Sequence, residues 1–116
     1  MKYFLAAMVL MVFAIPARAE ERSSNDGNEL LSSCQAMVRI FDDHDNKADY
    51  CLAGNCLGLV RGVGYACPKV CITHGVNTMQ AVRVVVKYLQ DHPEKLNLDN
   101  VVFIQDALTK AFPCKK

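Results

Sequence analysis

The chain has 116 residues, of which 52% are hydrophobic and 22% are charged, and it contains six cysteines and no tryptophan. This length fits one small domain, and the high apolar fraction with a net charge of +1 excludes a disordered chain. A nucleic-acid-binding protein is also excluded, because 12 acidic residues balance the 13 basic ones and no basic stripe stands out.

Residues 1–19 (MKYFLAAMVLMVFAIPARA) have the pattern of a secretory signal peptide. Lys2 provides a short positive region, residues 3–15 form an apolar run, and residues 17–19 form a small-x-small cleavage site. The apolar run is shorter than the roughly 20 residues that a membrane span requires. We therefore expect cleavage after Ala19, which leaves residues 20–116 as a single exported domain without membrane attachment.

The first helix of this domain is expected to begin after Asp26 and to end near Phe41. Asp26 stands three residues before Glu29, which is the pattern of a capping box. Apolar side chains then recur at steps of three and four residues, which marks one helical face: Leu30, Cys34, Met37, Val38 and Phe41. The polar residues 42–49 that follow predict an exposed loop.

Residues 52–65 predict a second helix with an unusual glycine pattern. Gly54, Gly58 and Gly62 lie four residues apart and therefore share one face. Each glycine costs roughly 1 kcal/mol relative to alanine inside a helix. We expect tight internal packing against another helix to offset this cost, and a subunit interface on the same face is the alternative.

Two further helices complete the expected fold. The third begins at Asn77, with Gln80 three residues on, and Pro93 breaks it within residues 91–95. The fourth begins after Asn97 or Asp99 and ends before Pro113. Short connections favour antiparallel neighbours, so the sequence predicts an all-α, up-and-down arrangement of four helices.

The cysteines predict disulfides that staple these helices. All six lie beyond the expected cleavage site: Cys34, Cys51, Cys56, Cys67, Cys71 and Cys114. An even number in an exported chain indicates disulfides, each worth about 2–4 kcal/mol, in preference to a zinc site. The end of the fourth helix lies near the start of the third in an up-and-down arrangement, so Cys71–Cys114 is the best pairing.

The remaining pairings follow less directly from the spacing. The positions of Cys34 in the first helix and Cys56 early in the second suggest a bridge between them. Cys51 and Cys67 are then left for a third bridge, although they lie at opposite ends of the second helix if that helix is continuous. Six cysteines permit 15 connectivities, among which sequence alone does not decide.

No arrangement of residues indicates catalysis, a metal site or a cofactor. The histidines fall in expected loops without a partner at helical spacing: His44, His74 and His92. Bridged sulfurs cannot act as nucleophiles. The acidic loop lacks the glycine and terminal glutamate of an EF-hand, although it carries four carboxylates, namely Asp42, Asp43, Asp45 and Asp49. A rigid module that binds another protein is the better interpretation.

Several motifs resemble the type VI secretion amidase immunity proteins. In order, these are Cys34, residues 56–63 (CLGLVRGV), Cys71 with residues 75–96 (GVNTMQAVRVVVKYLQDHPEKL), and residues 107–114 (ALTKAFPC). The chain departs from the family pattern at Asn77, where threonine is usual. Cys51 and Cys67 look like additions to the family's four cysteines.

The resemblance implies a periplasmic, all-helical protein, often a homodimer, that binds and inhibits a cognate peptidoglycan amidase. Such toxins have a Cys-His active site in a groove that accepts the acidic peptide stem, and the immunity protein inserts a protruding loop into it. The stiff turn with two acidic groups is our first candidate for that loop: Asp91, His92, Pro93, Glu94 and Lys95. A plain helix–helix turn is the alternative there, and the acidic loop at residues 42–49 is the second candidate.

Two other classes remain open from sequence alone. A small periplasmic helical chaperone or stress protein would also be exported and dimeric, but it would bind clients only after acid-induced opening, which three bridges would hinder. A thiol oxidoreductase would need an accessible reactive cysteine, and the chain has no C-x-x-C pair.

Overall fold

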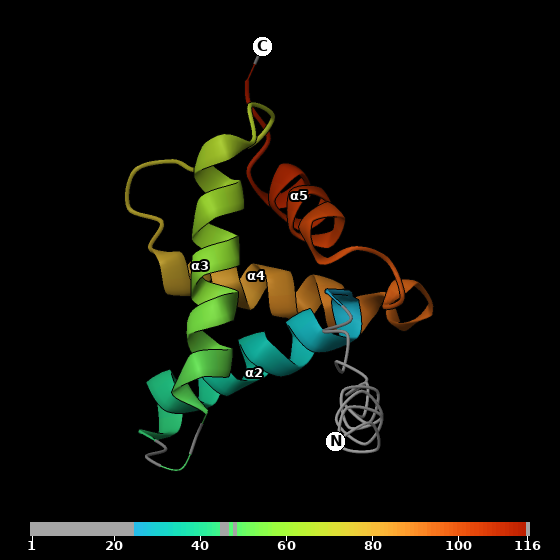
Figure 1. Cartoon of the computed structure of the whole chain (residues 1–116). Helices are drawn as coiled ribbons and strands as arrows, with labels where there is room; N and C mark the ends of the chain where they lie inside the picture. The colour runs from blue at the N-terminus through green and yellow to red at the C-terminus, as the bar shows by residue number, and fades with distance from the viewer. Residues whose placement is uncertain (1–24, 45–46, 48, 116) are drawn as a thin grey trace, which may run out of the picture.

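The structure is a computed structural model that describes residues 25–44, 47 and 49–115. This part of the chain contains four α-helices and one short 3-10 helix and no β-strand: α2 (Gly27–Asp43), α3 (Tyr50–Ala66), α4 (Thr78–Asp91), η1 (Pro93–Lys95) and α5 (Asn100–Ala111) (Figure 1). The all-α fold class is therefore confirmed. The expected signal peptide and Asp45 lie outside the described residues.

The expected helix caps explain where the helices begin. The Asp26 side chain accepts hydrogen bonds from the backbone N–H groups of Asn28 and Glu29, at 2.9 and 3.1 Å. Asn77 Oδ1 accepts from the Gln80 N–H at 2.8 Å. Asp99, rather than Asn97, caps the last helix. Local side-chain chemistry thus sets these three boundaries.

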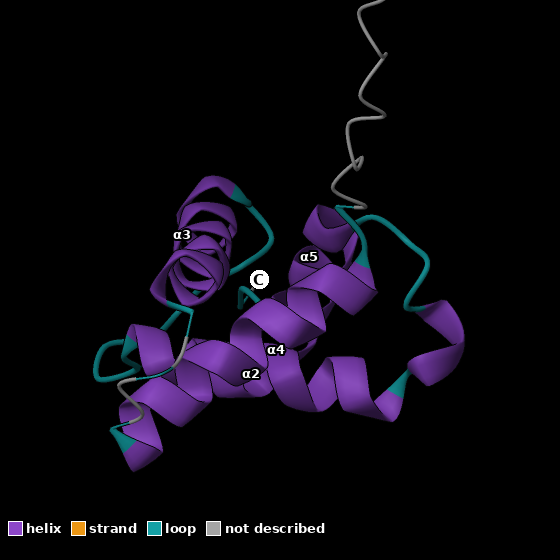
Figure 2. Cartoon of the chain, turned by 60° about the horizontal axis from the view of Figure 1, so that its bottom comes forward, coloured by secondary structure: helices purple, strands orange, loops and turns teal. Residues whose placement is uncertain are grey.

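The core lies where α3 crosses the other helices. In Figure 1, α3 stands across α2 and α4, and α5 packs beside its second half. Figure 2 views α3 nearly along its axis and shows α2 and α4 running next to each other. The largest fully buried apolar side chains come from all four α-helices: Leu30, Val60, Val82, Val85, Leu89, Ile104 and Leu108.

Two disulfides staple this arrangement, as the sequence predicts. Cys34–Cys56 joins α2 to α3 inside the core, with a Cα–Cα distance of 5.1 Å. Cys71–Cys114 joins the segment before α4 to the chain just beyond α5, with a Cα–Cα distance of 4.8 Å. The Cys71 N–H also donates to the Phe112 carbonyl at 2.9 Å. The second bridge therefore holds the irregular connection between α3 and α4 in place.

The prediction of a third bridge is wrong. Cys51 and Cys67 are both free thiols, the first exposed and the second half-buried. α3 is one continuous helix, so the 1.5 Å rise per residue places the two cysteines about 24 Å apart. A disulfide requires Cα atoms within about 7 Å, and no bridge within one chain can span the helix.

The expected internal packing of the glycine face is also wrong. Gly54, Gly58 and Gly62 are exposed, and a Cβ at any of them would meet no atom within 4 Å. Within α3, Gly64 is the glycine that packs internally, because its Cβ would lie 3.2 Å from Ile72 Cδ1. The four-residue spacing showed that the three glycines share a face, but the apolar residues on the other side of α3 determine which face points inward: Ala53, Cys56, Val60 and Gly64.

Candidate functional site

The first candidate, residues 91–95, forms a short protruding turn after α4. Pro93 starts the single 3-10 turn η1, and the Lys95 N–H donates to the His92 carbonyl at 3.1 Å. Asp91, Pro93, Glu94 and Lys95 are exposed, while His92 is half-buried. The turn therefore presents charged side chains to the outside from a backbone that closes on itself.

His92 belongs to the support of the turn rather than to its outer surface. Its Nδ1 lies 2.7 Å from the Tyr88 carbonyl, and its ring centroid lies 4.2 Å from that of Tyr88. Tyr88 in turn meets the buried Phe103 edge to face, with the centroids 6.1 Å apart. This stack anchors the start of the turn to the helices beneath it.

The chain leaving the turn is pinned to the start of α2. The Leu96 carbonyl accepts hydrogen bonds from the Asn28 backbone and side chain, at 3.2 and 3.1 Å. The Gly27 N–H donates to the Leu98 carbonyl at 3.0 Å. A Cβ at Gly27 would lie 2.9 Å from the Leu96 carbonyl oxygen, so this close approach requires glycine. The turn is thus held at both ends.

The two carboxylates of the turn differ in their surroundings. Asp91 Oδ2 lies 3.1 Å from Lys87 Nζ, one helical turn earlier. No ion pair in the described part of the chain involves Glu94, which is exposed. Glu94 is therefore the carboxylate of this turn that is available to a partner.

In the second candidate, residues 42–49, the carboxylates of Asp42 and Asp49 are engaged within the fold. Asp42 forms a two-pronged ion pair with Arg83 of α4. The hydrogen bond from Arg83 lowers the pKa of Asp42 below its ordinary value. Asp49 Oδ1 caps α3 by accepting from the Leu52 N–H at 3.0 Å. Asp43 is exposed, and no group of metal-ligating side chains was found among the described residues.

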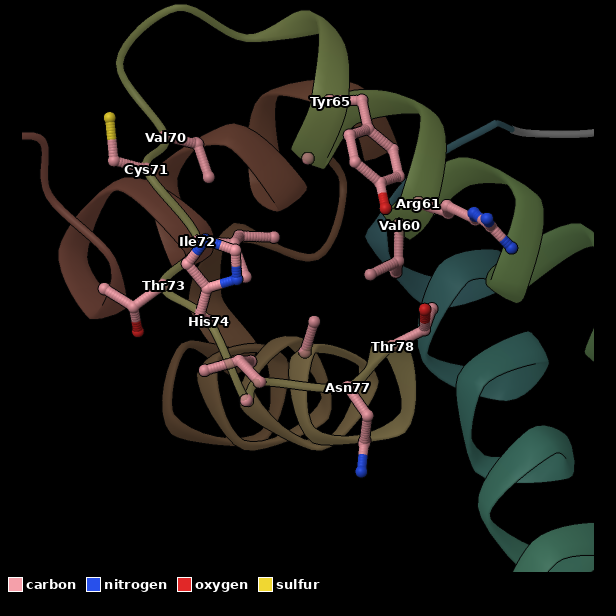
Figure 3. A pocket seen from close by; sticks show the side chains of 14 residues that line it. Val60, Arg61, Tyr65, Val70, Cys71, Ile72, Thr73, His74, Asn77 and Thr78 are labelled. Atoms are coloured by element: carbon pink, nitrogen blue, oxygen red, sulfur yellow. The ribbon is translucent and has the colours of Figure 1, made fainter.

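A pocket of about 530 Å³ lies between the second half of α3 and the connection to α4 (Figure 3). The sequence-based interpretation missed it, because residues 70–77 are irregular and carry no periodic pattern. Buried residues form part of its lining, and exposed residues form the rim: Val60, Gly64, Val70 and Ala81 within, and Arg61, Tyr65, Thr73 and His74 outside. The sequence does distinguish this region by its charge, since residues 50–90, which include the whole pocket lining, contain no Asp or Glu.

Two of the three histidines have other surroundings in the fold. His92 is bound to Tyr88, and His74 lines the pocket. Within the described residues, no hydrogen bond joins a histidine to Cys51 or Cys67.

No helix in the described residues is both long and apolar enough to span a membrane.

Comparison with known proteins identifies the family of the chain. No curated protein and no solved structure matches the chain. The family model described as Rap1a immunity proteins matches residues 26–114, which run from the cap of α2 to the second bridge. The matched region includes both disulfides, the 91–95 turn and the pocket. The chain therefore belongs to the Rap1a immunity proteins, the type VI secretion immunity family, and its role is immunity to an effector.

Proposed function

We propose that the chain is a periplasmic immunity protein that binds a cognate peptidoglycan amidase and blocks its active-site groove with residues 91–95. Family membership supports the immunity role. The observation that carries the finer proposal is the turn itself, which is exposed, charged and anchored at both ends. Two disulfides are consistent with an oxidising compartment outside the cytoplasm.

A turn held in this way suits insertion into a groove. Ordering a flexible loop on binding costs about 0.5–1.5 kcal/mol for each side chain that is immobilised. The proline at 93 and the contacts of His92 and Leu96 remove part of this cost before binding occurs. Glu94, which forms no ion pair with any described residue, then offers its carboxylate to a groove that accepts an acidic peptide stem.

Charge reversal tests which loop makes the contact. Glu94→Arg is expected to weaken binding to the purified amidase encoded beside this chain by at least roughly tenfold, because it removes an attraction and adds a repulsion. Asp43→Arg makes the same change of charge on the second candidate loop and is expected to leave the dissociation constant nearly unchanged. Titration calorimetry of both variants decides the assignment, and an unaltered constant for Glu94→Arg would reject it.

We also propose that the protein is a homodimer, with the outer face of α3 as the contact. Internal packing does not compensate for the three exposed glycines of this face, so a second copy becomes the better explanation of their cost. Tyr50, at the start of the same face, is well exposed. The contact that we propose centres on Gly54 and Gly58, in the part of α3 that precedes Arg61 and Tyr65. Gly58→Leu, whose Cβ would have no neighbouring atom within 4 Å, is expected to give a folded monomer in sedimentation velocity. An unchanged dimer would exclude this face, and a monomeric wild-type protein would exclude the dimer.

A further inference from the structure

One stretch of the chain carries basic residues and no acidic residue. Residues 50–90 contain no Asp or Glu and carry four basic side chains, namely Arg61, Lys69, Arg83 and Lys87. The last two are paired with carboxylates at Asp42 and Asp91. Within the described residues, no carboxylate pairs with Arg61 or Lys69. These two cations are therefore available to an acidic partner.

Arg61 lies on the rim of the pocket between α3 and the connection to α4. Its guanidinium carbon is 5.8 Å from the centroid of the Tyr65 ring. Tyr65 is 81% exposed, which is a large exposed fraction for an aromatic side chain. In Figure 3 the Tyr65 hydroxyl points toward the open centre of the pocket, and Arg61 and His74 stand on opposite sides of it. None of the residues that line the pocket is acidic.

The interior of the pocket is apolar. Val60 and Ala81 line it and are 1% and 2% exposed, and Ile72 lies against α3 at the position of Gly64. The interior is therefore suited to an apolar side chain, and the exposed rim with Arg61 and His74 is suited to polar or charged groups. Pockets that combine apolar walls with a few placed polar groups are typical binding sites.

The irregular wall of the pocket is held in one conformation. The Cys71–Cys114 bridge fixes its beginning. A turn follows in which the Val76 N–H donates to the Thr73 carbonyl at 3.3 Å, and Gly75 has a φ of 92°, which favours glycine. Asn77 then caps α4. A ligand would thus meet a pocket that exists before binding.

We propose that this pocket receives an acidic peptide segment of the effector, with an apolar side chain on Val60 and Ala81 and a carboxylate beside Arg61. The proposal rests on the proposed function, because it takes the effector as the source of the segment. The pocket and the 91–95 turn lie at opposite ends of α4, whose 14 residues span about 21 Å. The chain would then hold the effector at two places of opposite charge.

Dissociation kinetics test the contact at Arg61. Arg61→Glu is expected to raise the dissociation rate constant of the inactive amidase encoded beside this chain roughly tenfold, because a direct charge contact is lost. Tyr65→Ala is expected to have an effect of similar size. Lys69→Glu makes the same change of charge on an exposed residue outside the pocket lining. It is therefore expected to lower the association rate constant slightly and to leave dissociation unchanged.

The outcomes separate this inference from the proposed function. If the wild-type chain does not bind the amidase, the proposed function itself fails. If it binds and both pocket variants dissociate at the wild-type rate, only the pocket is overturned. Equal acceleration by Arg61→Glu and Lys69→Glu would also overturn it, since the effect would then be long-range electrostatics.

A measurement without the amidase tests the chemistry of the pocket directly. Acetyl-Glu-Leu-Glu-amide is expected to shift backbone amide resonances at residues 60–65 and 72–78 with a dissociation constant in roughly the millimolar range. Acetyl-Gln-Leu-Gln-amide, which has the same shape without charge, is expected to bind more weakly. Absence of shifts in this region, or equal shifts with both peptides, would contradict a preference for acidic segments.

Discussion

Removing the Cys71–Cys114 bridge is expected to destabilise the protein by several kilocalories per mole. The bridge closes a loop of 43 residues, and the loss of loop entropy in the unfolded chain gives about 4 kcal/mol for that length. Cys71 is exposed and Cys114 is half-buried, so serine at both positions stays near water and adds little cost of its own. A domain of this size is stable by only about 5–15 kcal/mol, so the change is a large fraction of the total.

Urea unfolding of the Cys71→Ser/Cys114→Ser variant, followed by circular dichroism, measures this loss. The matched comparison is Cys34→Ala/Cys56→Ala, whose shorter loop of 22 residues gives about 3.4 kcal/mol from the same relation. Both of those sulfurs are fully buried, so the cavity adds to the loss, and the shorter loop is expected to cost as much as the longer one or more. A loss below about 1 kcal/mol for the serine variant would refute the entropy argument.

Three further outcomes follow from the described contacts. Gly58→Ala is expected to raise the stability of the monomer by roughly 1 kcal/mol in thermal unfolding. Gly64→Ala is expected to raise it less, because the added Cβ would press on Ile72. Equal gains in stability would contradict the assignment of Gly58 to the exposed face of α3 and of Gly64 to the buried face. The stability that Asp42 contributes through Arg83 is expected to be present at neutral pH and to be lost as the pH falls through the lowered pKa of Asp42. The difference in stability between wild type and Asp42→Asn should therefore shrink in acid. A difference that stays constant with pH would show that the ion pair does not contribute to stability. Ellman titration of the unfolded, unreduced monomer is expected to give two free thiols, those of Cys51 and Cys67. A count of zero thiols would show that these two cysteines form a disulfide.

Local signals made most of the fold predictable from the sequence. Asp26, Asn77 and Asp99 cap their helices through their own side chains, so the boundaries can be identified in the sequence. The apolar stripe of α2 identifies its buried face through Leu30 and Cys34, whereas Phe41 at the end of the stripe is exposed. The expected pairing of Cys71 with Cys114 needed only the proximity of two helix ends.

The errors arise where the sequence gives a pattern without its orientation. The glycines of α3 share a face whether that face is buried or exposed, and the packing of Val60 and Gly64 against the core decides between the two. The pair between Asp42 and Arg83 joins residues 41 positions apart, so the acidic loop could not be recognised as structurally engaged. The pocket depends on Gly75 and its neighbours, whose conformation no periodicity encodes.

Inhibition of a peptidoglycan amidase by this chain tests the central claim of the proposed function most directly. The measurement is the release of cleaved peptide from purified peptidoglycan, with the wild-type chain or Glu94→Arg added in equimolar amount to the enzyme. Blocking of the groove by the 91–95 turn predicts that the wild-type chain abolishes release and that Glu94→Arg leaves most of it. Undiminished release with the wild-type chain, or full inhibition by Glu94→Arg, would contradict the account.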